Sequence, residues 1–88
     1  MLLVGTTRGL LDLDTGKTIV DGPAVTALAP GPNGWHALLN RRVVVRLDGG
    51  DAKTVGELPD DDGQSLAVLA DGTVVVGRTG ARLARVGA

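Results

Sequence analysis

The chain has 88 residues and a formal net charge of −1, which fits a single domain. It contains no Cys, so disulfides and thiolate metal sites are excluded. The near-neutral charge argues against general capture of nucleic acid or of an anionic membrane, and we expect neither as a partner. The sequence carries neither a signal-peptide pattern nor an apolar run long enough to span a membrane, so we expect a cytoplasmic location.

Glycine and proline, 14 and 4 residues respectively, interrupt the sequence at short intervals and leave no window long enough for a helix. The segments between them are rich in Val and Leu, which is typical of short strands. In chain order, we predict strands over residues 2–6, 9–13, 17–20, 25–29, 35–40, 42–47, 53–57, 65–70, 73–78 and 81–86. Because the connections are short, neighbouring strands are expected to pair antiparallel in a meander.

The sequence also repeats itself. Residues 6–16 align with residues 40–50, and residues 27–30 align with residues 68–71. The repeating unit of about 40 residues, with four short strands, has the pattern of a β-propeller blade. We therefore predict a single all-β domain over residues 1–88 that holds about two and a half blades, with units near 1–22, 23–61 and 62–88. The four strands of a blade are named A to D from the axis outward. In these terms, the order of the ten predicted strands along the chain is B-C-D, A-B-C-D, A-B-C.

Residues 12–19 read Asp-Leu-Asp-Thr-Gly-Lys-Thr-Ile. This segment resembles the Asp-box of BNR-type, sialidase-like propellers, Ser-x-Asp-x-Gly-x-Thr-Trp, because it matches at Asp14, Gly16 and Thr18. It departs from that pattern at Asp12 and Ile19. The opening residues 2–11 are also similar to the start of WD40-like and YVTN-type repeat propellers. The resemblance implies a propeller fold in which this segment is a structural turn, not a catalytic element.

The sequence predicts no enzyme. The resemblance to sialidases implies an arginine triad with a Tyr–Glu pair, whereas this chain has no Tyr and only one Glu, Glu57. Ser65 and His36 are the only residues of their kinds, and nothing marks Ser65 as an activated nucleophile. Trp35 and His36 are expected on opposite faces of one strand, in packing roles rather than in a shared ligand pocket. We expect no catalytic residue and no cofactor.

Residues 60–62 are three consecutive aspartates, followed by Gly63. Clustered carboxylates can hold Ca²⁺, but their spacing does not match the alternating ligands of an EF-hand loop. We therefore predict a solvated acidic turn and no metal site.

Arginines occur in all three predicted B–C turns. In a propeller, these turns lie on the same face as the D–A connections, and ligands usually bind on that face. The candidate ligand-binding residues are Arg8, Arg41, Arg42 and Arg78. Together they could clamp a carboxylate or a phosphate. The D–A connections carry Asp21 and residues 60–62, so the favoured alternative is that these arginines only offset neighbouring aspartates as exposed pairs.

Two and a half blades cannot close a ring, because each blade sheet needs a neighbour on both faces. The chain is therefore expected to be either a fragment of a longer propeller or a homo-oligomer whose copies cover the open faces and strand edges. The leading interpretation is a non-enzymatic propeller-blade module that self-associates. The alternative is a propeller that binds an acidic sugar or another small anion on the face bearing the arginines.

Overall fold

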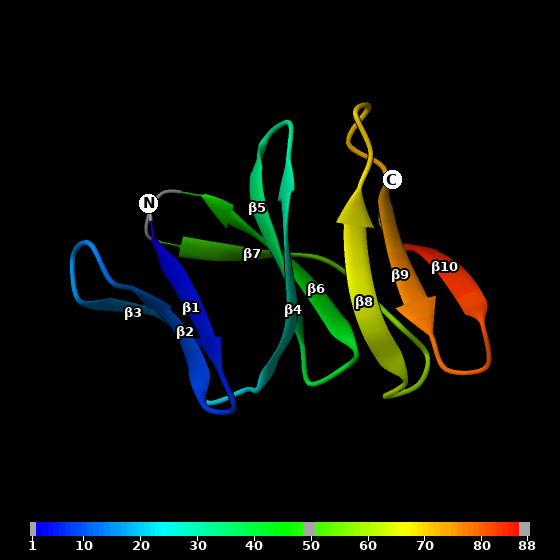
Figure 1. Ribbon diagram of the computed structural model, residues 1–88, viewed down its shortest axis with the longest axis horizontal. Helices are drawn as coiled ribbons and strands as arrows, with labels where there is room; N and C mark the ends of the chain where they lie inside the picture. The colour runs from blue at the N-terminus through cyan, green and yellow to red at the C-terminus, as the bar shows by residue number, and fades with distance from the viewer. Residues whose placement is uncertain (1, 49–50, 87–88) are drawn as a thin grey trace.

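The computed structural model describes residues 2–48 and 51–86, and within them it contains only strands, turns and connections (Figure 1). This confirms the predicted all-β class. The strands are β1 (Leu3–Thr6), β2 (Gly9–Asp12), β3 (Lys17–Asp21), β4 (Val25–Gly31), β5 (Gly34–Leu39), β6 (Val43–Asp48), β7 (Asp51–Glu57), β8 (Gly63–Val68), β9 (Val74–Arg78) and β10 (Arg82–Val86).

The strands form three antiparallel sheets, β1-β2-β3, β4-β5-β6-β7 and β8-β9-β10. Each hydrogen-bonded pair joins strands that follow one another along the chain, as the short connections predict. We call these the N-terminal, central and C-terminal sheets. The strand bounds shift most at β8, which ends at Val68 rather than at residue 70. The reason is a turn that follows it, in which the Gly72 amide donates to the Leu69 carbonyl (2.9 Å) and the Thr73 amide donates to Asp71 Oδ1 (2.9 Å).

The core lies in two layers, one on each face of the central sheet. The N-terminal seam, between the N-terminal and central sheets, is built on Leu10, Ala37, Leu39, Val45 and Leu47. The C-terminal seam, between the central and C-terminal sheets, is built on Leu38, Val44, Leu58, Val74, Val76 and Val86. Successive residues of a strand point to opposite faces, so alternation along β5 and β6 supplies both seams. The central sheet is therefore covered on both faces.

The turns gather along two edges of the molecule. The β1–β2, β5–β6 and β9–β10 turns and the β3–β4 and β7–β8 connections lie along the lower edge in Figure 1. The β4–β5 and β8–β9 turns lie along the upper edge. Strand β4 contacts both β1 and β8, so the first strands of the three sheets are neighbours near the middle of the molecule.

Candidate functional site

The lower edge holds all four arginines that the sequence singles out. Arg8 lies in the β1–β2 turn, Arg41 and Arg42 lie in the β5–β6 turn, and Arg78 is the last residue of β9. We call this edge the arginine edge. The structure brings Arg41, Arg42 and Arg78 together around the β7–β8 connection, because each of them contacts residues of that segment or the start of β8. Arg8 stands apart in the N-terminal sheet, where its carbonyl accepts a hydrogen bond from the Gly22 amide (2.9 Å).

Arg78 and Asp62 form the most sheltered ion pair of this edge. Arg78 Nε lies 2.9 Å from Asp62 Oδ1, and each side chain is 14% exposed. Arg82 Nη2 reaches the other carboxylate oxygen at 2.8 Å, and Arg78 Nη2 lies 3.5 Å from Asp60 Oδ2. The hydrogen bond from Arg78 is the main cause that holds the pKa of Asp62 below its usual value, and the charges of Arg78 and Arg82 add to it. The same hydrogen bond raises the pKa of Arg78.

Arg41 ties the central sheet to the C-terminal sheet. Its carbonyl accepts from the Gly63 amide (2.8 Å), and its Nε lies 3.3 Å from the Gly63 carbonyl oxygen. The turn that carries it is a tight hairpin in which both Asn40 and Arg41 have positive φ, 51° and 61°. Two such residues define the turn type that matches the twist of a β-hairpin. The Arg41 amide also donates to Thr26 Oγ1 (3.0 Å), so contacts on both sides fix this left-handed backbone.

Arg42 is more exposed, and two carboxylates face it. Its Nε lies 3.3 Å from Glu57 Oε1 and its Nη1 lies 3.5 Å from Asp61 Oδ1. Beside it runs an open groove of about 630 Å³, lined by Ala24, Thr26, Asn40, Arg41, Arg42, Val43 and Asp61. An anion that entered this groove would have to compete with carboxylates already held by the arginine. The described part of the chain gives the Arg8 side chain no hydrogen bond or ion pair.

The segment that resembles an Asp-box forms the β2–β3 turn, and its polar groups bond locally. The Asp14 amide donates to Asp12 Oδ1 (3.0 Å), and the Gly16 amide donates to the Asp12 carbonyl (2.8 Å). Gly16 has φ 72°, the left-handed region that glycine adopts without a steric cost. Asp14 Oδ2 accepts from the Leu2 amide (2.9 Å) and so connects the turn to the start of β1. These bonds close the turn.

The upper edge holds a second concave site, which the sequence analysis did not predict. It is a pocket of about 360 Å³ at the upper end of the C-terminal seam, lined by Pro32, Asn33, His36, Arg46, Lys53, Thr54, Val55, Asp71, Gly72, Val74 and Val86. Trp35, which is partly exposed, is not among the lining residues. One signal in the sequence could have found this site: Arg46 interrupts the apolar run 43–47 at a position whose side chain faces a seam.

The chain matches no known family model, and it matches no curated protein. Residues 2–48 and 51–86 include no helix that is long and apolar enough to cross a membrane. The same residues contain no group of three or more His, Asp or Glu side chains placed to hold a metal ion. The aspartates at 60–62 form ion pairs with Arg42 and Arg78.

Proposed function

We propose that the chain is a non-enzymatic β-propeller module whose function is to self-associate into a propeller-like assembly. The observation that carries this proposal is the unequal covering of the three sheets. The central sheet has a seam on each face, whereas each outer sheet has a seam on one face only. In a propeller every sheet packs between two neighbours, so the outer sheets have the form of blades that lack a neighbour.

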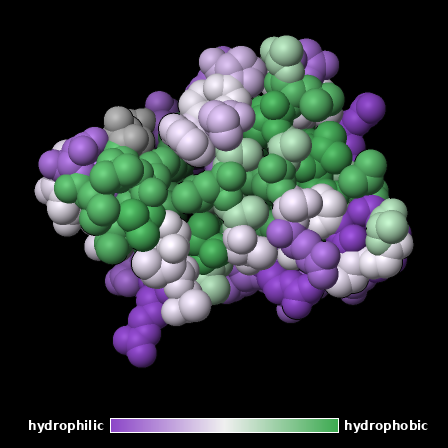
Figure 2. Space-filling model, viewed as in Figure 1, coloured by the Kyte–Doolittle hydropathy of each residue, from purple (hydrophilic) through white to green (hydrophobic). Residues whose placement is uncertain are grey.

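The uncovered faces carry apolar side chains. In the N-terminal sheet Leu3 and Leu10 point into the seam, so the directly paired Val4 and Leu11 point outward. In the C-terminal sheet Val74, Val76, Ala84 and Val86 point inward, so the alternating residues Val75 and Leu83 point outward. Leu83 is 76% exposed on β10, an edge strand, and Leu2 and Leu13 are also exposed. Figure 2 shows apolar residues gathered at the left, over the N-terminal sheet, and continuing across the middle of this view.

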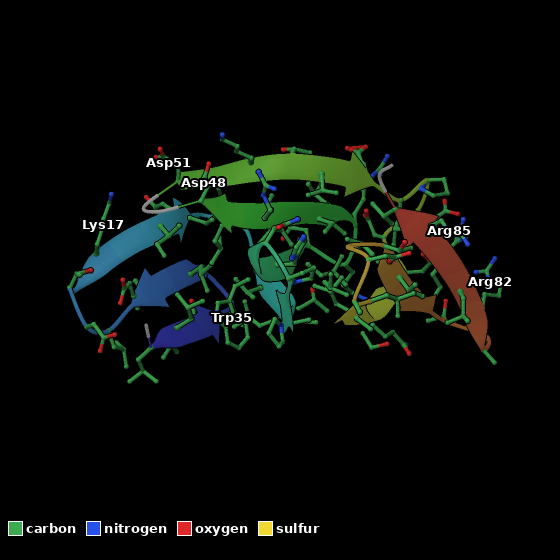
Figure 3. The ribbon with its side chains drawn as sticks, turned by 90° about the horizontal axis from the view of Figure 1, so that it is seen from above. Lys17, Trp35, Asp48, Asp51, Arg82 and Arg85 are labelled. Atoms are coloured by element: carbon green, nitrogen blue, oxygen red, sulfur yellow. The ribbon has the colours of Figure 1, made fainter. Side chains whose placement is uncertain are left out.

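Charge at the two ends of the long axis favours a head-to-tail contact between copies. Figure 3 places Arg82 and Arg85, from the C-terminal sheet, at one end, and Asp48 and Asp51 at the other, where Lys17 also lies. Opposite charges steer unlike surfaces together and disfavour contacts between like surfaces. A head-to-tail contact joins two different surfaces of the chain, and it forms a closed ring when the rotation between copies is suitable. The occupant of each uncovered face is therefore a second copy.

The alternative function is a propeller that binds an acidic sugar or another small anion at the arginine edge. The groove beside Arg41 and Arg42 favours it. The ion pairs of Arg42 and Arg78 argue against it, because carboxylates of the same chain already occupy these arginines.

The solution mass of the 88-residue chain tests the proposal by sedimentation equilibrium. We expect a species heavier than the 8.9 kDa of one chain at micromolar concentration. A folded species that keeps the mass of one chain as concentration rises would overturn the proposal.

Two variants test the head-to-tail geometry. Leu83→Lys and Leu11→Glu alter opposite contact surfaces, so each variant alone should dissociate. A mixture of the two should associate again, because every contact can then join Lys to Glu or one unaltered surface to another. Thr7→Glu, in the exposed β1–β2 turn, is the control and should leave the mass unchanged. Circular dichroism checks that each variant keeps its strands. If the two variants stay dissociated when mixed, the contact is not head-to-tail.

A further inference from the structure

Three basic side chains form one row across the central sheet. His36 on β5 is paired directly with Arg46 on β6, and Arg46 is paired directly with Lys53 on β7. Directly paired residues of an antiparallel sheet point to the same face, with Cβ atoms about 5 Å apart. Leu38 and Val44, two positions from His36 and Arg46, lie in the C-terminal seam, so the row faces this seam as well.

The row lines the 360 Å³ pocket at the upper end of the seam. Val74 and Val86 supply an apolar wall from the C-terminal sheet, and Asn33 and Asp71 contribute polar groups from the β4–β5 and β8–β9 turns. The pocket is thus bordered by aliphatic side chains, by the basic groups of the row and by the Asp71 carboxylate. Polar and charged side chains make up most of the lining, which suits a small charged ligand that a few converging polar groups hold in place.

His36 is the most unusual member of the row. Its side chain is deeply buried, with the residue only 5% exposed, and its Nδ1 has no hydrogen-bond partner in the described residues. Burial is the main cause that lowers the pKa of His36, and the charge of Arg46 lowers it further. The backbone of Gly34 opposes that shift, but it does not give Nδ1 a well-formed hydrogen bond. An unsatisfied buried nitrogen costs stability, so the site holds a polar group without an internal partner.

The charges of the row are also unevenly compensated. Arg46 is half-buried and makes no ion pair or side-chain hydrogen bond with the described residues. Lys53 Nζ lies 2.9 Å from Asp48 Oδ2 in an exposed pair near the β6–β7 turn. Asp71 already accepts a hydrogen bond from the Thr73 amide (2.9 Å). Like charges that face each other across paired strands destabilise a sheet, so Arg46 beside Lys53 has an electrostatic cost, part of which the charge of Asp48 offsets.

We propose that this pocket binds a small molecule through an oxyanion, a phosphate or a carboxylate group, with Arg46 and Lys53 as the cationic contacts and the Nδ1–H of neutral His36 as a hydrogen-bond donor. A guanidinium matches both kinds of oxyanion in two-point geometry, and an ammonium adds a point charge. A bound oxyanion offsets the repulsion within the row and gives the buried imidazole a partner. The site is independent of self-association, since its lining comes from one chain, and it lies on the edge opposite the arginine edge.

The experiment is a titration of the full chain with inorganic phosphate and, separately, with glucuronate, at constant ionic strength set by chloride. His36 is the only histidine in the sequence, so the spectrum contains the signals of a single imidazole. Its ¹⁵N resonances therefore report on the pocket and need no further assignment. We expect a saturable shift of these resonances with at least one of the two probes. Saturation with phosphate alone identifies a phosphate ligand, and saturation with glucuronate alone identifies a carboxylate ligand.

The variants locate the bound anion. Arg46→Gln should weaken binding about tenfold or more, the loss expected for one charge-assisted hydrogen bond. Lys53→Gln should weaken anion binding by a smaller factor. Because Lys53 is exposed, this substitution should leave the fold intact. The matched controls Arg8→Gln and Lys17→Gln, on the N-terminal sheet, should bind as the unaltered chain does.

Three results would overturn the proposal. The first is a His36 shift that fails to saturate with either probe, which would indicate a general salt effect. The second is equal affinity in Arg46→Gln, Lys53→Gln and the controls. The third is binding that is lost in Arg42→Gln but kept in Arg46→Gln, which would move the anion to the arginine edge. The solution mass, measured in parallel, separates any of these results from a failure of self-association.

Discussion

The two edges of the molecule use their basic residues differently. At the arginine edge, Arg42 and Arg78 meet the carboxylates of the β7–β8 connection and hold that connection against β5, β6 and β9. At the opposite edge, Arg46 faces Lys53 and a buried imidazole, and no carboxylate within the described residues pairs with it. The first arrangement satisfies its charges internally and so stabilises the fold. The second pairs Lys53 with Asp48 in an exposed contact but leaves Arg46 without an ion pair, which is the property expected of a binding site.

The largest expected effect concerns the apolar anchor of the arginine edge. Leu58, in the β7–β8 connection, is buried in the C-terminal seam, and its amide donates to the Arg42 carbonyl (2.8 Å). Leu58→Ala should lower the free energy of unfolding by about 2–5 kcal/mol, as for other buried leucines. Leu69→Ala is the matched control at the opposite edge, where Leu69 is exposed, and should change stability by less than about 0.5 kcal/mol. Denaturant unfolding measures both, and equal losses would show that the β7–β8 connection is not anchored by Leu58.

Asp62→Asn should have the next largest effect, because it removes the carboxylate shared by Arg78 and Arg82. The pKa of Asp62 is lowered in the folded chain, so its stabilising contribution is fully present above the unfolded-state pKa of about 4. That contribution is lost as the pH falls through the lower, folded-state pKa. The variant should therefore be less stable than the unaltered chain at neutral pH, and the difference should shrink below about pH 4.

Asp51→Asn serves as the control for this measurement. Asp51 is an exposed residue at the start of β7, away from the arginine edge, and its substitution should leave stability nearly unchanged. A stability difference between Asp62→Asn and the unaltered chain that stayed constant from neutral pH to pH 2 would contradict the assigned role of the carboxylate.

His36→Leu probes the opposite edge and should act in the other direction. Replacing a buried, unpartnered imidazole with an apolar side chain should raise the free energy of unfolding by about 1 kcal/mol. Because the pKa of His36 is lowered in the folded chain, the unfolded chain binds the extra proton first, so stability should fall as the pH drops below about 6.5. That decline should stop at the lower, folded-state pKa and be absent from the variant. A destabilised variant, or one with an unchanged pH profile, would show that His36 is satisfied in the folded chain.

The smallest expected effect is that of Arg8→Gln. Arg8 is exposed, and its side chain makes neither an ion pair nor a hydrogen bond with the described residues, unlike those of Arg41, Arg42 and Arg78. Its substitution should change stability by less than about 0.5 kcal/mol in denaturant unfolding. A loss as large as that of Asp62→Asn would place Arg8 in the same network as Arg78.

The strands were predictable because their cause is local. Runs of Val and Leu between glycines and aspartates set both the strands and the antiparallel pairing of neighbours, and the structure follows them. The arginine edge was predictable in part, since the alternation of turns placed the arginines near the aspartates. The pairing of each arginine with a particular carboxylate depends on how the sheets lie relative to one another. The sequence pattern does not specify that arrangement. The pocket was missed because it needs the exact pairing of His36 with Arg46 and of Arg46 with Lys53.

The order of the strands also bears on how the chain reaches its fold. Each sheet is complete as soon as its own stretch of sequence has paired, because each hydrogen-bonded partner is the adjacent strand along the chain. Topologies dominated by such local contacts fold faster than those that must first close long loops. We therefore expect the three sheets to form early, each from its own stretch of sequence. Packing of the side chains in the two seams should then limit the folding rate. Stopped-flow mixing should then show a lower folding rate constant for Leu38→Ala, because the Leu38 side chain lies in a seam. Thr7→Ala alters only a turn and should change that rate constant little.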